Sequence, residues 1–487
     1  MPGSPAHRAA VILLCALAGC RSEPSPPASA PPPAPRDQPR TAYIAYADAR
    51  PILESFTGSL PAPLAGKSPQ ELEAAWPAWT AQHDAAIRGR LAQGDEDSIV
   101  NFWLYGTSFT RQPRATADHL ARLGRNEIET LLVARLDDLV TGMTAPGTNE
   151  RLRFARQVVE RRGIDLSNDA GKDKAREYLV GVRERVIAET ARHTREAEST
   201  RKAARGDAAL ERYATLYHDR GLSSDTSLPV DFAVDRALAA LASGRDPAAA
   251  PVRRVAVIGP GLDFTDKAEG VDLYPPQTIQ PFALIDSLLR SGLAKGTDIQ
   301  LTAFDLSPRV IEHIRAASER GRGGTPYDLQ LPLARREPAA AWDLALVQYW
   351  RAFGGRIGRE IPSAGTAEGS PVQLRAVRVR PEIVAALTAE DLDVVVQRMQ
   401  RRERPLNPLD NDGFDLILAT NVLVYYDRFE QALALANIGA MLRPGGVFVT
   451  YYLVLPNPPL EPVASIVTPV YWDRQHNGDT MLIYKRR

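Results

Sequence analysis

Four residues at the predicted ends of strands form the clearest chemical pattern in this sequence. Gly259 and Gly261 follow Val255–Ile258, a β-branched run typical of a buried parallel strand. Asp305 ends a second such run, and Asn421 follows a third. Glycines directly after a strand allow a tight turn and close approach of the backbone to a ligand. An acid at the tip of the next strand can accept both hydroxyl groups of a ribose, so the pattern predicts a nucleoside site.

The elements around these residues explain how they would meet. The runs Ile299–Phe304 and Phe414–Thr420 are predicted strands, and Ser307–Pro308 is predicted to begin a helix between them. In open α/β sheets, ligands bind outside the carboxyl ends of the strands. Three distant points of the chain therefore converge on one predicted crevice.

The second half of the chain resembles a known family at this point. Phe414–Asp427, then Gln431, then Met441–Val449 with its Leu-Arg-Pro-Gly-Gly turn, are similar to the class I S-adenosylmethionine-dependent methyltransferases. Around the fourth and fifth strands the match is best with the chemotaxis-receptor methyltransferases. The resemblance covers about 235–487, roughly half of the chain.

The resemblance implies an α/β fold, a Rossmann-like seven-stranded methyltransferase sheet with helices on both faces. It implies S-adenosyl-L-methionine as cofactor, with Gly259 and Gly261 facing its methionine part and Asp305 its ribose. Asn421, with its neighbour Thr420, would lie at the edge of the pocket. The two segments Val467–Trp472 and Thr480–Tyr484 are predicted to be the final antiparallel hairpin.

Some features depart from the family pattern. Asp263 stands where the family's loop has a third glycine, and Asp305 lies 44 residues after Gly261, where about 20 is usual. Phe264–Thr278 is interpreted as an inserted loop beside the pocket.

A second long segment separates the predicted second and fourth strands. In it we place the third strand at Val372–Val379 and a helix that begins at Thr388–Asp391. The aromatic residues Tyr349, Trp350 and Phe353 are expected to pack in the core, with a role over the substrate as the alternative.

Methyl transfer needs alignment of nucleophile and methyl group, and a base only where the nucleophile is a hydroxyl or an amine. Tyr425, Tyr426 and Asp427 follow the fourth strand, near the expected substrate, but a core aromatic pair and a helix N-cap are the favoured interpretation. No catalytic residue is assigned. The seven histidines show no ligand spacing, so no metal is expected.

The first half predicts an all-α domain over 46–235, before a methyltransferase-like domain over 236–487. The capping box Ser68–Glu71 begins a helix towards Gly94, and a separate helix is expected at Ile99–Tyr105. Helical spacing continues over 173–219, and another helix is expected at Val230–Leu241. The change of composition places the domain boundary between 220 and 252.

The N-terminus predicts export. Residues 1–20 combine a positive start with an apolar run too short to span a bilayer. Leu17–Cys20 resembles the lipobox of bacterial lipoproteins, in which Cys20 receives lipid. A proline-rich tether over 21–45 follows. These features imply a lipid-anchored protein on the periplasmic face of the cell envelope, or a cytoplasmic one if the start codon is misassigned.

Composition narrows the partners. The chain has 59 Lys+Arg and 59 Asp+Glu, so a net charge of +0 argues against nucleic-acid binding. The expected substrate is a small molecule or a protein side chain, and the expected membrane contact is through the lipid anchor. S-adenosylmethionine is made in the cytoplasm, whereas Cys20 points outward. Two alternatives stay open: a non-catalytic lipoprotein that uses the fold to bind a ligand or partner, and an NAD-binding dehydrogenase.

Overall fold

The structure is a computed structural model in which the chain from Pro39 to Arg487 forms one compact unit. The residues that it describes are 41–203, 217–218, 220–222, 227–246, 248–263, 272–335, 341–365, 372–400, 413–451, 460–471 and 478–487. The predicted signal peptide, Cys20 and most of the predicted tether lie outside them.

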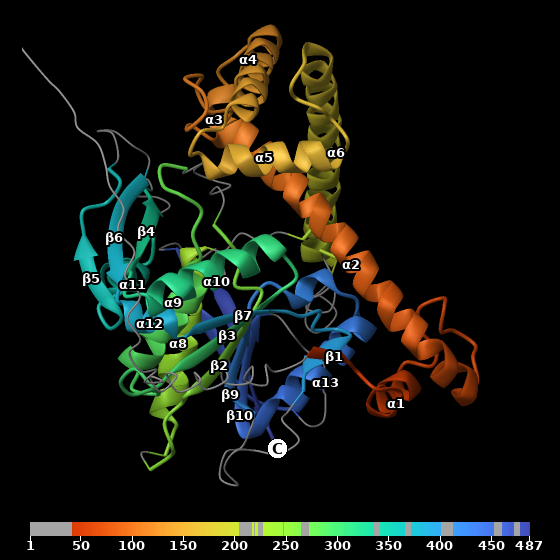
Figure 1. Ribbon diagram of the computed structural model, residues 1–487. Coiled ribbons are helices and arrows are strands. Elements are labelled where there is room, and N and C mark those ends of the chain that lie inside the picture. The colour runs from red at the N-terminus through yellow and green to blue at the C-terminus, as the bar shows by residue number, and fades with distance from the viewer. Residues whose placement is uncertain are drawn as a thin grey trace, which may run out of the picture. The chain divides into compact units, whose positions relative to one another are not determined.

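The first part of the described chain is mostly helical (Figure 1). Its elements are β1 (Thr41–Tyr43), α1 (Tyr46–Ser55), α2 (Pro69–Tyr105), α3 (Ala117–Leu120), α4 (Arg125–Thr144), α5 (Glu150–Arg161) and α6 (Asp169–Ala203). The Ser68–Glu71 capping box is present at the start of α2. The predicted end of this helix at Gly94 is wrong, because α2 continues to Tyr105. A Cβ on Gly94 would lie 1.6 Å from the carbonyl oxygen of Leu222, so the glycine permits a close chain crossing instead of ending a helix.

A seven-stranded sheet dominates the second part. Its strands are β2 (Arg254–Ile258), β3 (Gln300–Asp305), β7 (Leu387–Asp391), β9 (Phe414–Ala419), β10 (Leu442–Tyr451), β11 (Leu460–Thr468) and β12 (Asp479–Arg486). The spatial order is β11-β12-β10-β9-β2-β3-β7. The five strands from β10 to β7 are parallel, and β12 runs antiparallel to both of its neighbours. This confirms the seven-stranded α/β sheet and a final antiparallel strand pair. The bounds predicted for the first strand of the pair are wrong, because β11 ends at Thr468 and includes only Val467 and Thr468 of the predicted Val467–Trp472.

The order of the parallel strands defines a switch point. β2 comes first in the sheet's chain order, with β3 and β7 following on one side and β9 and β10 on the other. Doubly wound sheets bind ligands at the carboxyl ends of the strands where the order reverses in this way. The antiparallel β12 distinguishes this sheet from the six parallel strands of dinucleotide-binding folds.

The predicted third strand is wrong. Val372–Val379 does form a strand, β6, but it pairs antiparallel with β4 (Tyr327–Ala334) and β5 (Gly358–Ile361) in a separate sheet. The third parallel strand is β7, so the helix predicted to begin at Thr388–Asp391 is also wrong. Both segments carry buried apolar residues at alternate positions, and neither pattern states which sheet the strand joins. A further short pair links β1 to β8 (Gln397–Met399).

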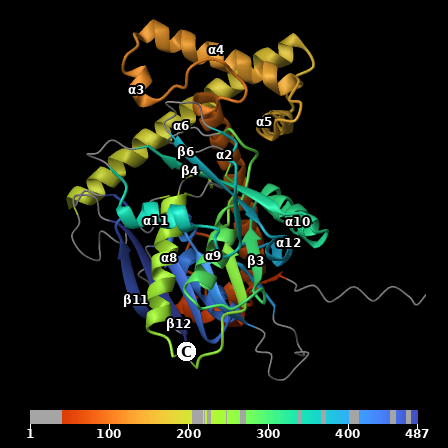
Figure 2. The same cartoon turned by 90° about the vertical axis from the view of Figure 1, so that its left-hand side faces the viewer.

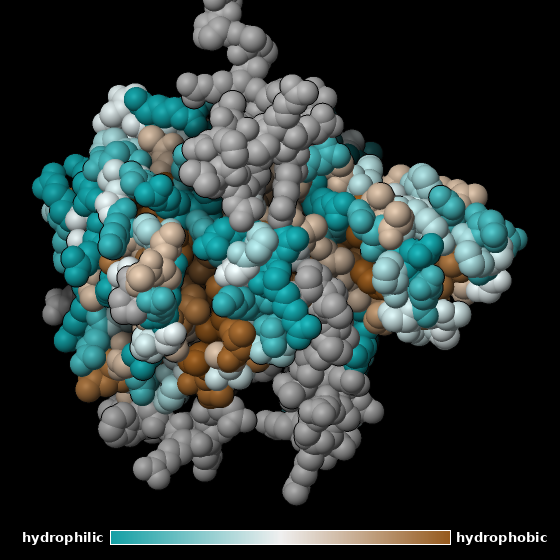
Figure 3. All heavy atoms as spheres, turned by 90° about the horizontal axis from the view of Figure 1, so that it is seen from below, coloured by the Kyte–Doolittle hydropathy of each residue, from teal (hydrophilic) through white to brown (hydrophobic). Residues whose placement is uncertain are grey.

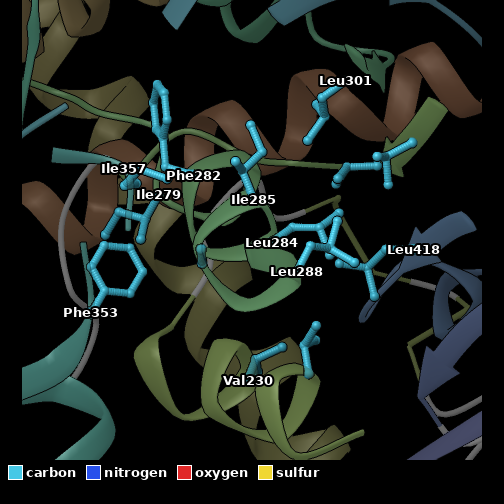
Figure 4. Close-up of a cluster of buried hydrophobic side chains, with 14 of the residues drawn as sticks. Val230, Ile279, Phe282, Leu284, Ile285, Leu288, Leu301, Phe353, Ile357 and Leu418 are labelled. Carbon is cyan, nitrogen blue, oxygen red and sulfur yellow. The ribbon is translucent and has the colours of Figure 1, made fainter. Parts of the chain in front are cut away.

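Helices cover both faces of the sheet (Figure 2). They are α8 (Leu228–Ser243), α9 (Gln280–Arg290), α10 (Pro308–Arg322), α11 (Leu344–Ala352), α12 (Pro381–Ala385) and α13 (Arg428–Met441), with the short helix η2 at Leu423–Tyr425. On one face, α8 and α9 bury Val230, Phe282 and Leu288 against sheet residues such as Leu418 (Figure 4). Phe353 belongs to the same core, together with Tyr349 and Trp350, so the predicted packing role of these aromatics is confirmed.

Helix α2 belongs to two cores. Its first half buries Trp76 and Trp79 with α1, α13 and the other face of the sheet. Its second half buries Phe102 and Trp103 with α4, α5 and α6. The described helical segment is thus joined to the sheet by one continuous helix. The ranges 46–235 and 236–487 stay predictions as domain boundaries.

The surface seen from below mixes hydrophilic side chains with a band of apolar ones (Figure 3), as most protein surfaces do. Among the described residues, no helix has both the length and the apolar character needed to cross a membrane.

Candidate functional site

A cavity of about 100 Å³ lies at the carboxyl ends of β2, β3 and β9. Gly259, Gly261, Asp305 and Asn421 all line it. The structure therefore brings the four sequence-predicted residues together at the switch point of the sheet. Their role in binding a cofactor stays a prediction.

The two glycines adopt a backbone conformation that residues with a Cβ disfavour. Gly259 and Gly261 have φ of +68° and +70°, in the left-handed region that side chains with a Cβ disfavour. A Cβ on Gly259 would also lie 2.5 Å from Cγ2 of Val422. The loop therefore keeps bare backbone at the cavity wall, and the Gly259 N–H donates to the carbonyl of Phe304 at 2.8 Å.

Asp305 is held at the tip of β3 by backbone groups. The N–H of Ser307 donates to its carboxylate at 2.8 Å, and the N–H of Gly261 also hydrogen-bonds to it. Burial raises the pKa of Asp305 to about 6, against the effect of these hydrogen bonds and of the Arg309 charge. At neutral pH the group is therefore mainly a carboxylate, able to accept hydrogen bonds from a ligand.

Asn421 is strained. Its φ is +53°, and it is the only non-glycine residue among the described ones that has a positive φ. Asparagine tolerates this conformation better than most residues, and such strain is concentrated at functional sites. The preceding Thr420 is buried, and its hydroxyl oxygen accepts a hydrogen bond from Gln280 Nε2 at 2.7 Å.

Helix α2 covers the cavity, and we call Leu91 of α2, Leu222 and Tyr425 the roof of the cavity. These three residues line it together with the strand ends. The guanidinium group of Arg90 donates to the carbonyls of Tyr217, Arg220 and Tyr425 at 3.2, 3.0 and 2.8 Å. One side chain of α2 thus ties this helix to the segment that follows β9.

Two charged side chains of α2, His83 and Arg88, contact the end of β7, the residues after it and α13. His83 contacts Asp393 through Nδ1 at 3.0 Å and Glu430 through Nε2 at 3.1 Å. Burial opposes the charged ring, but the hydrogen bonds and charges of the two carboxylates outweigh it and raise the pKa of His83 to about 9. Arg88 makes a bidentate contact with Asp391 at the end of β7, at 2.9 and 3.1 Å.

The residues after β9 have structural roles. Asp427 is the N-cap of α13 and forms a capping box with Glu430, and Tyr426 is buried, as the favoured interpretation expected. Tyr425 and Tyr426 both line the cavity.

His218, Asp427 and Glu430 place potential ligand atoms within 4.8 Å of one another. This grouping joins distant parts of the sequence, so ligand spacing could not reveal it. The carboxylates in this grouping already have partners, because Asp427 caps α13 and Glu430 contacts His83 and His218.

Asp263 and the described residues of the predicted inserted loop do not line the cavity. Asp263 accepts hydrogen bonds from Tyr274 and Gln277 at 3.1 and 3.2 Å. The described end of the inserted loop contacts the helical part, where Asp272 accepts from the backbone N–H groups of Thr107 and Ser108. None of the described residues of this loop lines the cavity, and 264–271 lie outside the described part.

Several cavity residues were not predicted from the sequence. Leu91, Leu222 and Val230 look like ordinary apolar residues of helices or loops, and they reach the cavity only through tertiary packing. His83 gives no sequence signal either, because its two partners lie more than 300 residues away.

Comparisons with known proteins give only weak similarities. No family model matches the chain, and no curated protein matches it. Among solved structures, the N-methyltransferase NodS from Bradyrhizobium japonicum WM9, in complex with S-adenosyl-L-homocysteine, is 15% identical, with 57% of this chain and 96% of NodS covered and a TM-score of 0.26. The mitomycin 7-O-methyltransferase MmcR is 12% identical, with 86% and 100% covered and a TM-score of 0.26. The cyclase SpnF is 12% identical, with 52% and 80% covered and a TM-score of 0.23. No activity or substrate of this chain follows from similarities at these values.

Proposed function

We propose that this chain is an S-adenosylmethionine-dependent methyltransferase. One observation carries the proposal: two left-handed glycines after β2, a carboxylate at the tip of β3 and a strained asparagine after β9 line a single cavity at the switch point of the sheet. Open α/β sheets bind nucleotide ligands at this place.

The residues present fit this cofactor. Asp305 supplies an ionised acceptor for the two ribose hydroxyls. Leu306, Leu392 and Val394 line the cavity near the ends of β3 and β7 and offer apolar surface to the flat base. The bare backbone at Gly259 then faces the methionine end. The cavity of about 100 Å³ is smaller than the roughly 300–1,000 Å³ of typical ligand sites.

When bound, the cofactor supplies an electrophilic methyl group, and the protein mainly aligns it with the nucleophile. The glycine loop and Asp305 hold the nucleoside end. Leu91, Leu222 and Tyr425 exclude water above the strand ends. No side chain at the cavity is assigned as a general base, and the acceptor belongs to a small molecule or to a protein side chain.

Calorimetric titration of the purified protein tests the proposal. We expect saturable heat with S-adenosylmethionine and none with NAD. A chain that gives no heat and no fluorescence change with millimolar S-adenosylmethionine contradicts it. The fold would then act as a non-catalytic binding scaffold.

The proposed location is the cell envelope, with the chain anchored by lipid on Cys20. The support for it is the sequence of the leader, with its lipobox-like Leu17–Cys20 and the proline-rich tether. The proposal also includes a similarity to the chemotaxis-receptor methyltransferases. It further includes an all-α domain in the N-terminal half.

A further inference from the structure

The side chain of Gln280, the first residue of α9, links helix α8 to the turn that follows β9. Gln280 is 1% exposed, and its partners Asp231 on α8 and Thr420 after β9 are also buried. Its Nε2 donates to Thr420 Oγ1 at 2.7 Å, and its side chain also hydrogen-bonds to Asp231. Oε1 of Gln280 has no partner among the described residues, so both bonds come from Nε2, which has two hydrogens. The amide is therefore fixed with Nε2 towards the turn.

The turn held in this way contains a strained residue. Asn421 has a left-handed φ of +53°, and such a conformation persists only where the surrounding structure holds it. On one side of Asn421, Thr420 is bonded to Gln280. On the other side, Val422 lies against the bare backbone of Gly259, since a Cβ there would lie 2.5 Å from Cγ2 of Val422. Asn421 is therefore held between two contacts.

The three residues of this turn, Thr420, Asn421 and Val422, all line the cavity, whereas Gln280 does not. A side chain behind the cavity wall affects a ligand only through the residues that it holds in place. Buried polar groups that are hydrogen-bonded favour one arrangement of the elements they join. Without the bond from Gln280, the turn is free to relax towards ordinary backbone, and the cavity wall would change shape.

Building on the proposed function, we propose that Gln280 is a positioning residue for the cofactor: its bond to Thr420 keeps Asn421 left-handed, the backbone conformation in which the turn after β9 contacts S-adenosylmethionine. Gln280 itself does not touch the ligand. When the bond is lost, only molecules with the left-handed turn can bind, and the apparent affinity falls with their fraction. A fall to about a tenth corresponds to about 1.4 kcal/mol, which is comparable with the cost of left-handed backbone for an L-residue.

Gln280→Met tests the inference, because it removes both donors and keeps a side chain of similar length. Titration calorimetry of the full chain is expected to show about tenfold weaker binding of S-adenosylmethionine. In an Asn421→Gly chain the same substitution is expected to weaken binding by about twofold or less, because glycine adopts the left-handed conformation without support. A role in stability alone would lower the unfolding midpoint of both chains and would not produce this difference.

Gln277→Met is the matched control. Gln277 is also a buried glutamine, and its Nε2 donates to Asp263 and to the carbonyl of Gln330. Neither Gln277 nor these two partners line the cavity. This variant is expected to lower the unfolding midpoint and to leave the affinity for S-adenosylmethionine unchanged.

A second variant breaks the same bond from the other side. Thr420→Val removes the acceptor hydroxyl and nearly keeps the shape of the side chain. Its affinity loss, compared with and without Asn421→Gly, gives the same test where Gln280→Met does not fold. The loss is again expected to be smaller in the Asn421→Gly chain.

Equal fold-losses of affinity with and without Asn421→Gly overturn the inference. A Gln280→Met chain that binds as the wild type does also overturns it. So does a failure of Asn421→Gly alone to bind, because the inference assigns the backbone conformation and not the asparagine side chain. In these cases the wild-type chain still binds the cofactor, and the proposed function stands. No binding of S-adenosylmethionine by the wild-type chain defeats the proposed function, and this inference with it.

Discussion

The carboxylate of Asp305 has two roles, one structural and one at the cavity. It fixes the loop after β2 through the N–H of Gly261 and the start of α10 through the N–H of Ser307. It also lines the cavity. A substitution that removes the whole side chain would mix these effects, so the informative change removes the charge and keeps the shape.

Asp305→Asn is expected to weaken S-adenosylmethionine binding at least tenfold, about 1.4 kcal/mol. The amide keeps one acceptor oxygen but loses the charge that strengthens hydrogen bonds from the ribose hydroxyls. Titration calorimetry measures the change. Asp263→Asn is the matched control, because Asp263 lies in the loop after β2 that Asp305 holds and does not line the cavity. Equal losses in the two variants would mean that Asp305 acts only through the loop.

Gly259→Ala is expected to destabilise the protein by about 1–2 kcal/mol, because the residue keeps a positive φ that costs an L-residue about that much. Its new Cβ would also meet Val422 Cγ2. Adding Val422→Ala removes the clash with the Val422 side chain but leaves the cost of the positive φ. Denaturant unfolding of both single variants and the double variant should therefore show partial rescue. Strictly additive losses would contradict a clash between these two side chains.

At the scale of elements, α2 connects the helical core to the sheet and covers the cavity between them. It makes charged contacts with the end of β7, with the residues after it and with α13: Arg88 with Asp391, and His83 with Asp393 and Glu430. His83 and Asp393 are buried, and the charge of the histidine ring depends on its protonation. The attachment of α2 should therefore respond to pH.

His83 makes the unfolding free energy depend on pH. Its pKa is about 9 in the folded chain against 6.5 for an unperturbed histidine. The raised value means that its stabilising contribution is complete below about pH 6.5 and is lost as the pH rises through about 9. The loss is at most on the order of 3 kcal/mol. Denaturant unfolding from pH 6 to 10 measures it, and His83→Gln should flatten the curve in this range. His119→Gln on α3 is the control, and a wild-type curve that is flat from pH 6.5 to 9 would contradict the prediction.

The elements also show what a sequence can and cannot reveal. The strands β2, β3 and β9 and their terminal residues follow from local pattern, because buried parallel strands are short apolar runs. The exchange of β6 for β7 shows the limit, since alternation predicts a strand and not its partners. Gly94 lies where the chain at Leu222 passes close to α2, and the covering of the cavity by α2 depends on similar long-range contacts.

At the scale of the whole molecule, the cavity and the leader point to different compartments. The proposed cofactor is made in the cytoplasm, whereas a lipidated Cys20 would hold the chain outside it. A proline-rich tether extends up to about 3.1 Å per residue, so the roughly 20 residues after Cys20 would let the folded part sit tens of ångströms from a membrane. The location therefore decides which pool of cofactor and substrate the cavity can meet.

Cys20→Ala tests the location independently of the cavity. In a bacterial host with the lipoprotein pathway, the wild-type chain should lose residues 1–19, gain lipid on Cys20 and sediment with membranes. The variant lacks the thiol that accepts the lipid, so it should keep its leader or leave the membrane fraction. Mass spectrometry of the N-terminal peptide and fractionation measure both effects. Cys15→Ala is the matched control, because Leu14 before it is too bulky for the cleavage site, and this variant should behave as the wild type. A wild-type chain that stays in the cytoplasmic fraction with residues 1–19 intact would contradict export, and the cavity would then share a compartment with the cofactor.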